Sequence, residues 1–82
     1  MSQGVTVLLF ARYADLLGQS TLEVPARDAE SVATIVAYVR SLPGGGVLPA
    51  RPLVAVNLRQ VDLEYRPQPG DEVAFLPPMA GG

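Results

Sequence analysis

The chain has 82 residues, the size of one small domain with little room for a deep active site. Hydrophobic residues make up 49% of it and charged residues 17%, which is typical of a globular protein and excludes a disordered one. The net charge of -2 disfavours nucleic acid as the main partner, because that partner selects a basic face.

The side-chain chemistry is limited, because the chain has neither cysteine nor histidine. Disulfides, thiolate nucleophiles, Cys/His metal sites and the usual general base are therefore excluded, and we expect no metal site and no bound cofactor. No positively charged, apolar leader opens the sequence, and no apolar run approaches the ~20 residues of a membrane span. We expect a cytoplasmic protein with no membrane partner.

The first quarter of the chain predicts two strands separated by a short helix. Residues 5–10, Val-Thr-Val-Leu-Leu-Phe, favour a strand buried on both faces. Residues 11–18 carry apolar side chains at helical spacing and end in Gly18, which predicts one or two helical turns. Residues 21–25 alternate polar and apolar, which indicates a half-exposed second strand.

The middle of the chain predicts the main helix. Four apolar residues recur at the spacing of one helix face, namely Val32, Ile35, Val36 and Val39. Ser31 or Asp28 is suited to cap its first turn. The helix should end near Leu42, since Pro43 and three glycines follow.

The segment after this helix, residues 43–52, is rich in proline and glycine and predicts a flexible surface loop. A phosphate-binding loop is disfavoured, because the segment lacks the Gly-Lys-Ser/Thr ending and the chain has no lysine. Residues 53–57 predict a third strand, residues 61–65 a short fourth strand, and residues 72–76 the last. Before the last strand, Pro69-Gly70 fits the central positions of a type II turn.

The order of elements, two strands, a helix and three strands, predicts an α+β fold of the β-grasp (ubiquitin-like) type. A mixed sheet would pack on one main helix in a domain of residues 1–76, followed by an extended, flexible tail of residues 77–82. In this fold one set of strand residues faces the helix: Val5, Val7, Leu9, Val73 and Phe75. The alternate set lies on the opposite face near the tail, as a docking surface unless a neighbouring loop covers it: Thr6, Leu8, Phe10, Ala74 and Leu76.

The tail is the strongest candidate for function. Its sequence, Pro77-Pro78-Met79-Ala80-Gly81-Gly82, follows the apolar run Phe-Leu. Two glycines without Cβ let a narrow channel close around the backbone, and two prolines keep the chain extended. The terminal carboxylate is therefore suited to modification inside a partner's active site. An unselected, frayed end is the alternative.

Several segments together resemble the MoaD family, the small sulfur-carrying subunits of molybdopterin synthase. They are residues 7–11 (Val-Leu-Leu-Phe-Ala), 16–18 (Leu-Leu-Gly), 53–57 (Leu-Val-Ala-Val-Asn) and 69–82. The specific part is Gly-Asp-Glu-Val-Ala-Phe joined to Pro-Pro-x-x-Gly-Gly. The tail reads Phe-Leu-Pro-Pro-Met, where the family often has a second Phe and a Val; this difference concerns the fine specificity for partners.

The resemblance implies that the chain is a sulfur carrier and not a catalyst by itself. The Gly82 carboxylate would be adenylated by a MoeB-type enzyme that uses ATP, then converted to a thiocarboxylate by a sulfur donor. It would pass sulfur to cyclic pyranopterin monophosphate in a pocket of the large subunit, MoaE, within a heterotetramer. Gly81 would give clearance, and Met79 and Ala80 would fix the depth of insertion. The partner-binding residues would be Phe10, Leu76, Pro77 and Pro78.

Three other functions remain open on the sequence. A sibling carrier for thiamine, cysteine or tRNA thiolation shares the fold and the Gly-Gly end, and only the Pro-Pro tail argues against it. A ubiquitin-like protein modifier is possible, although the absence of lysine excludes polymeric chains through lysine. An interaction module with an inert tail is the third. An enzyme acting alone is disfavoured, since no side-chain nucleophile and base are paired.

Overall fold

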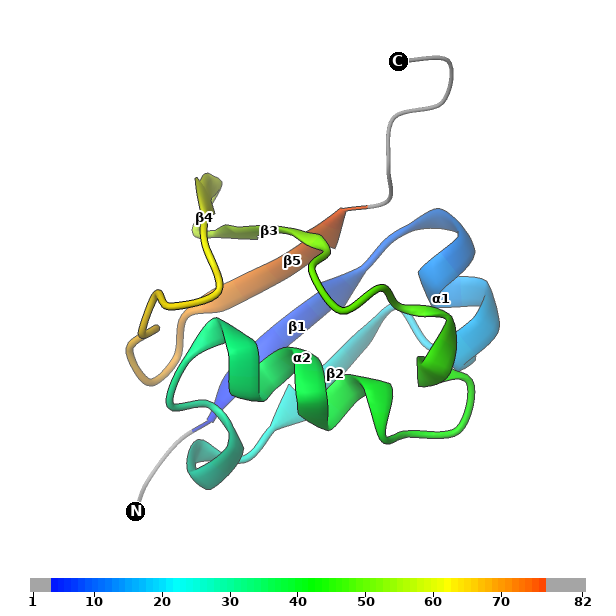
Figure 1. Ribbon diagram of the computed structural model, residues 1–82, viewed down its shortest axis with the longest axis horizontal. Coiled ribbons are helices and arrows are strands. Elements are labelled where there is room, and N and C mark those ends of the chain that lie inside the picture. The colour runs from blue at the N-terminus through cyan, green and yellow to red at the C-terminus, as the bar shows by residue number, and fades with distance from the viewer. Residues whose placement is uncertain (1–3, 77–82) are drawn as a thin grey trace.

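The computed structural model describes residues 4–76, which form a five-stranded mixed sheet with two α-helices (Figure 1). The strands are β1 (Val5–Leu9), β2 (Thr21–Val24), β3 (Leu53–Val56), β4 (Arg59–Val61) and β5 (Glu72–Leu76). The helices are α1 (Ala11–Leu17) and α2 (Val32–Arg40), with the short 3₁₀ turns η1 (Ala26–Asp28) and η2 (Gly45–Val47).

The strand order, β2-β1-β5-β3-β4, places the first and last strands side by side at the centre. β1 and β5 run parallel, with Leu9 opposite Phe75. β2 is antiparallel to β1, and β3 is antiparallel to β5 with Leu53 opposite Leu76. This topology confirms the predicted β-grasp fold. The proposed division at residue 76 stays a prediction, since residues 77–82 lie outside the described part of the chain.

The start of α2 is held by a capping box and by a backbone connection to the β4–β5 segment. Ser31 Oγ accepts from the Thr34 amide at 3.3 Å, and Thr34 Oγ1 accepts from the Ser31 amide at 3.1 Å. The first two amides of α2 donate to the carbonyls of Tyr65 and Leu63, each at 2.9 Å. Amides that an isolated helix leaves without partners are therefore satisfied, and the predicted cap at Ser31 is confirmed.

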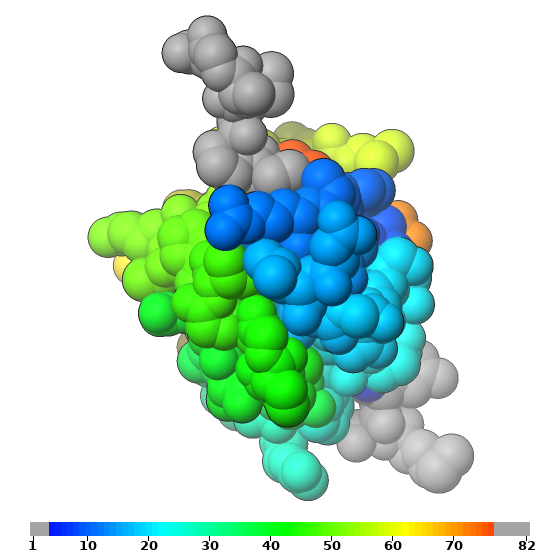
Figure 2. All heavy atoms as spheres, turned by 90° about the vertical axis from the view of Figure 1, so that its right-hand side faces the viewer, coloured from blue at the N-terminus to red at the C-terminus, as the bar shows by residue number. Residues whose placement is uncertain are grey.

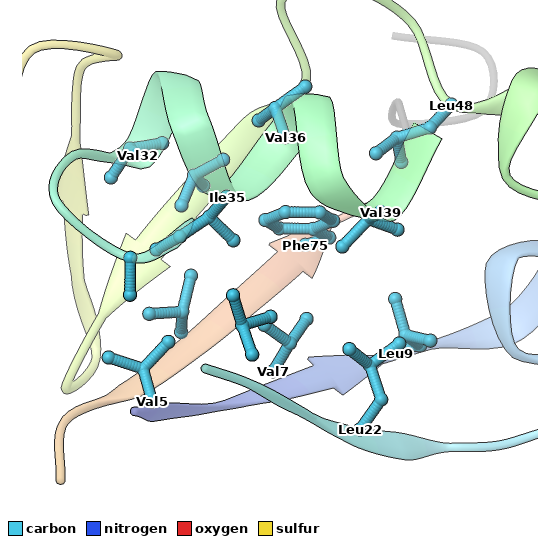
Figure 3. Packing of buried hydrophobic residues seen from close by; sticks show 14 of the residues in the cluster. Val5, Val7, Leu9, Leu22, Val32, Ile35, Val36, Val39, Leu48 and Phe75 are labelled. Carbon is cyan, nitrogen blue, oxygen red and sulfur yellow. The ribbon is translucent and has the colours of Figure 1, made fainter. Parts of the chain in front are cut away.

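One hydrophobic core lies between α2 and the sheet (Figure 3). In the close-up, the ring of Phe75 lies under α2 near Val36 and Val39, with Val7 of the neighbouring strand below it. The buried apolar residues are Val5, Val7, Leu9, Tyr13, Leu22, Val24, Ala29, Val32, Ile35, Val36, Val39, Leu48, Val54, Val56, Val73 and Phe75. Burial of each large side chain contributes about 1.5–3 kcal/mol.

The predicted parity of the two central strands is confirmed. Val5, Val7 and Leu9 of β1 are buried, as are Val73 and Phe75 of β5. The alternate residues on the opposite face are exposed or partly exposed, namely Thr6, Leu8, Ala74 and Leu76, together with Phe10 at the end of β1. Because side chains alternate across a strand, one face is packed by α2 and the other is open.

The predicted fourth strand was wrong in its position. β4 spans Arg59–Val61, since Asn57 and Leu58 form a two-residue turn that pairs Arg59 with Val56. The following residues leave the sheet because the Asp62 carboxylate accepts from the Glu64 amide at 3.0 Å, forming a local turn. Of the alternating residues 61–65, only Val61 thus belongs to a strand, and residues 62–65 form a turn.

The prediction of a surface loop at residues 43–52 needs correction as well. The segment contains η2, Leu48 is buried in the core, and Gly45 is buried against the end of α2. Gly44 has a left-handed φ of 85°, and a Cβ there would overlap the Leu16 carbonyl oxygen. Figure 2 shows α1 in blue and this segment in green side by side. The glycines permit close backbone packing that a larger residue would prevent.

The turn before β5 has the predicted geometry. Gly70 has a φ of 87°, as the third residue of a type II turn requires, and the Asp71 amide donates to the Gln68 carbonyl at 3.0 Å. The turn thus directs the chain into β5.

Candidate functional site at the end of β5

Three exposed apolar side chains lie on, or directly after, adjacent strands where β5 ends. Phe10 is 44% exposed, Leu53 is 41% exposed and Leu76 is 36% exposed. Leu53 is the register partner of Leu76 across β3 and β5. Phe10 continues β1 in an extended conformation directly after Leu9, which pairs with Phe75, so that it lies beside Leu76. We call Phe10, Leu53 and Leu76 the C-terminal patch.

The backbone next to Phe10 is strained. Ala11, the first residue of α1, has a φ of 49°, a left-handed conformation that a residue with a Cβ rarely adopts. The Tyr13 amide donates to the Phe10 carbonyl at 3.1 Å, and the buried Tyr13 anchors the turn in the core. Such a conformation costs of order 1–3 kcal/mol and is retained only where surrounding packing imposes it.

The opposite end of the open face is polar. Thr6 Oγ1 donates to Glu23 Oε2 at 2.7 Å across β1 and β2. Asn57 Nδ2 donates to Asp71 Oδ1 at 3.0 Å, and Asn57 Oδ1 accepts from the Glu72 amide at 3.1 Å. These bonds join the β3–β4 turn to the start of β5. The open face is therefore apolar near Leu76 and polar near Glu72.

The predicted site residues are only partly within the described chain. Gly82 and the tail residues Pro77, Pro78, Met79, Ala80 and Gly81 lie outside it. The structure brings Phe10 and Leu76 together, and their role in binding a partner stays a prediction. Leu53 was missed. Its alternation with the buried Val54 and Val56 could have placed it on the open face.

Other features of the described residues give little support to a separate site. A hollow of about 220 Å³ at the β4 edge is lined by Val56, Arg59, Gln60, Val61 and Tyr65. Within residues 4–76, no group of three acidic side chains is arranged to hold a metal ion. No helix in this part of the chain is long and apolar enough to cross a bilayer.

A match to a family model identifies the family of this chain. The model of the ThiS family matches residues 7–82, which include β1 from Val7 onward, the other four strands, both helices and the Gly-Gly end. The chain belongs to the ThiS family. This assignment agrees with the β-grasp topology and with the position of β5 directly before the tail.

Two curated relatives of this ThiS family member carry the same name. It is 33% identical over 81 residues to the molybdopterin synthase sulfur carrier subunit of Escherichia coli K12, covering 95% of this chain and 99% of that protein. It is 34% identical over 80 residues to the protein of the same name from Haemophilus influenzae, with the same coverage. The resemblance to the MoaD family is therefore confirmed.

Solved structures support the fold. A small archaeal modifier protein, SAMP1 from Haloferax volcanii, superposes with a TM-score of 0.79 at 23% identity, covering 96% of this chain and 99% of that one. A chain from the complex of subunits 1 and 2 of the molybdopterin-converting factor of Helicobacter pylori 26695 superposes with a TM-score of 0.71 at 22% identity. The match covers 95% of this chain and 97% of that one. At these identities the likeness concerns the fold alone.

Proposed function

We propose that this ThiS family member is the sulfur-carrier small subunit of a molybdopterin synthase. The observation that supports the proposal most is identity of 33–34%, over nearly the full length, to proteins that carry this name. The Gly81-Gly82 end supports it independently, because a side-chain-free tether suits insertion of a carboxylate into a partner. In this proposal the chain acts in the cytoplasm.

The chemistry takes place on the Gly82 carboxylate. An oxygen of the carboxylate attacks the α-phosphorus of ATP in a MoeB-type enzyme and releases pyrophosphate. The resulting acyl adenylate has a good leaving group. Hydrosulfide supplied by the sulfur donor adds to the acyl carbon, the carbon–oxygen bond to AMP breaks, and a thiocarboxylate remains. The terminal sulfur is anionic at neutral pH, and anionic sulfur is the reactive form in thiol chemistry. The acceptor would be cyclic pyranopterin monophosphate.

Each part of the chain has a separate task in this proposal. The β-grasp domain presents the C-terminal patch to a MoaE-type large subunit, with Pro77 and Pro78 extending the chain away from β5. Met79 and Ala80 set the depth of insertion, and Gly81 passes the narrowest part of the channel. The chain supplies no catalytic side chain and holds no resident cofactor, so that the catalytic groups belong to its partners and ATP to the activating enzyme. The working assembly is a heterotetramer of two small and two large subunits.

The intact mass of the protein tests the carrier role directly. The protein is incubated with a MoeB-type enzyme, ATP and a sulfur source, and its mass is measured. We expect a gain equal to one oxygen replaced by sulfur, and no gain when Gly82 is deleted. An unchanged mass, with an enzyme shown to load another carrier, would reject the proposal in favour of an interaction module.

Insertion of the tail is tested by Gly81→Ala, with Gly46→Ala as the matched control. A Cβ at Gly46 meets nothing within 4 Å, so that the control adds the same methyl group at an open position. We expect Gly81→Ala to leave the fold intact and to reduce sulfur transfer to the precursor about tenfold or more, as misplacement of a reacting group does. Equal transfer by both variants would contradict insertion through a narrow channel.

A second candidate is a sibling carrier that serves thiamine, cysteine or tRNA thiolation. The match to the ThiS family model favours it as well, since that model does not specify the sulfur acceptor. The loaded protein distinguishes the two when it is mixed with purified large subunit and cyclic pyranopterin monophosphate. Formation of molybdopterin supports the first function, and a thiocarboxylate that stays unreacted supports the second.

A further inference from the structure

The surroundings of the C-terminal patch carry an unusual charge. Arg12 lies two residues after Phe10 on the first turn of α1, and Arg51 lies two residues before Leu53. Both arginines are exposed. Figure 2 shows the dark-blue start of α1 next to the red-orange end of β5. Arg12 is the second residue of α1, whose N-cap is the patch residue Phe10.

Neither arginine has a carboxylate partner within residues 4–76. The ion pair found in this part of the chain joins Arg27 to Asp28 within η1, at 3.6 Å. Asp15 follows Arg12 by three residues on α1, but no ion pair joins them. The two guanidinium groups are therefore open to a charge on another molecule.

Five of the eight carboxylates lie at or beyond the opposite end of the sheet. Glu23 bonds to Thr6 near the start of β1, and Asp71 bonds to Asn57 before β5. Asp28 and Glu30 precede α2, and Glu72 begins β5. The other three are Asp15 on α1 and the pair Asp62 and Glu64, which follow β4. A chain of net charge -2 thus has two arginines without an ion-pair partner in residues 4–76 that follow or precede patch residues by two positions.

We infer that Arg12 and Arg51 guide the docking of the C-terminal patch onto a partner protein whose apolar pocket is bordered by Asp or Glu side chains. The inference rests on the proposed function, in which this end of the sheet meets the large subunit. The patch is small, so that complementary charge at its border speeds encounter and fixes orientation more than it adds contact area. The strained Ala11, between Phe10 and Arg12, holds the apolar and the charged side chain on one turn.

Association kinetics test the inference with charge-neutral variants of matched size. Arg12→Gln with Arg51→Gln removes two charges at the patch, and Arg59→Gln with Arg66→Gln removes two at the far end. The full-length protein is tested against the molybdopterin synthase large subunit of the same organism, from about 0.02 to about 0.5 M salt. We expect the Arg12→Gln, Arg51→Gln protein to associate about tenfold more slowly at low salt, with an association rate that depends less on salt. The Arg59→Gln, Arg66→Gln protein should change the rate and its salt dependence less than about twofold.

Each other outcome overturns the inference. If both double substitutions slow association equally, the effect is one of net charge alone. If Arg12→Gln with Arg51→Gln does not slow association, these arginines do not guide docking. If only the KM for ATP in the loading reaction rises, the arginines serve a nucleotide phosphate and not a carboxylate border. If the unmodified protein neither binds the large subunit nor gains sulfur, the proposed function fails and the inference fails with it.

Discussion

The two ends of the open sheet face are formed by the same strands but are built differently. At the Glu72 end, the side chains of Thr6, Asn57 and Asp71 are joined by short hydrogen bonds to their neighbours. At the Leu76 end, the three patch residues are apolar and partly exposed. An end whose polar groups are already satisfied serves stability, whereas exposed apolar side chains gain by burial against another molecule.

The sharpest test of this division compares neighbouring residues of β5. Phe75 is fully buried under α2, so that Phe75→Ala should lower the free energy of unfolding by about 3–5 kcal/mol. Leu76→Ala removes a partly exposed side chain and should cost less than about 1 kcal/mol while weakening partner binding. Urea unfolding and a binding titration measure both. A large stability loss for Leu76→Ala would place that side chain in the core and invalidate the patch.

The packing of η2 against α1 gives the next largest effect. Gly44→Ala should destabilise the protein by about 2–4 kcal/mol, because its Cβ would overlap the Leu16 carbonyl oxygen and its φ is left-handed. Gly18→Ala is the matched control, since Gly18 has a similar φ of 76° but open space around it, and should cost about 1–2 kcal/mol. Thermal unfolding compares the two. Equal losses would mean that close packing at Gly44 contributes nothing.

The polar end is tested by removing the side chain that links its two turns. Asn57→Ala should lower the free energy of unfolding by about 1–2 kcal/mol, because the Asp71 carboxylate and the Glu72 amide each lose a partner. Asn57 also has a left-handed φ of 50°, so that Asn57→Gly separates the hydrogen bonds from the backbone conformation. Binding to the large subunit should not change in either variant. Weaker binding would extend the docking surface to the polar end.

The smallest expected effect is a gain in stability at the tip of the β3–β4 turn. Leu58 has a φ of 73° and is 94% exposed, so that its side chain gains little from burial and its backbone is strained. Two-residue turns with both φ values positive favour Asn-Gly. Leu58→Gly should therefore raise the free energy of unfolding by about 0.5–1 kcal/mol. A loss of stability in the urea midpoint would show that Leu58 packs on something that its exposure does not reveal.

The fold was predictable from the sequence because its local signals agree. The spacing of Val32, Ile35, Val36 and Val39, the cap at Ser31 and the following glycines all indicate one helix. The strand parity of residues 5–9 and 72–76 follows from alternation alone. The candidate site was predictable to the extent that Phe10 and Leu76 belong to these regular strands.

The predictions were wrong where contacts distant in sequence compete with local pattern. Residues 61–65 alternate like a strand, but their carbonyls are used by the first amides of α2 and their chain is turned by Asp62. Residues 43–52 have the composition of a loose loop, but Leu48 enters the core and Gly44 packs on α1. A composition rule does not include such long-range contacts.

By itself, the sequence determined the β-grasp order, the main helix, the two faces of the central strands and the Gly-Gly end. These depend on periodicity, on caps and on covalent order, which are local properties of the chain. Only the tertiary structure decided that Leu53 joins Phe10 and Leu76 at one end of the sheet, and that Asn57 links to Asp71 at the other. Each of these depends on strand register and on the turns between elements, which place residues far apart in sequence on one surface.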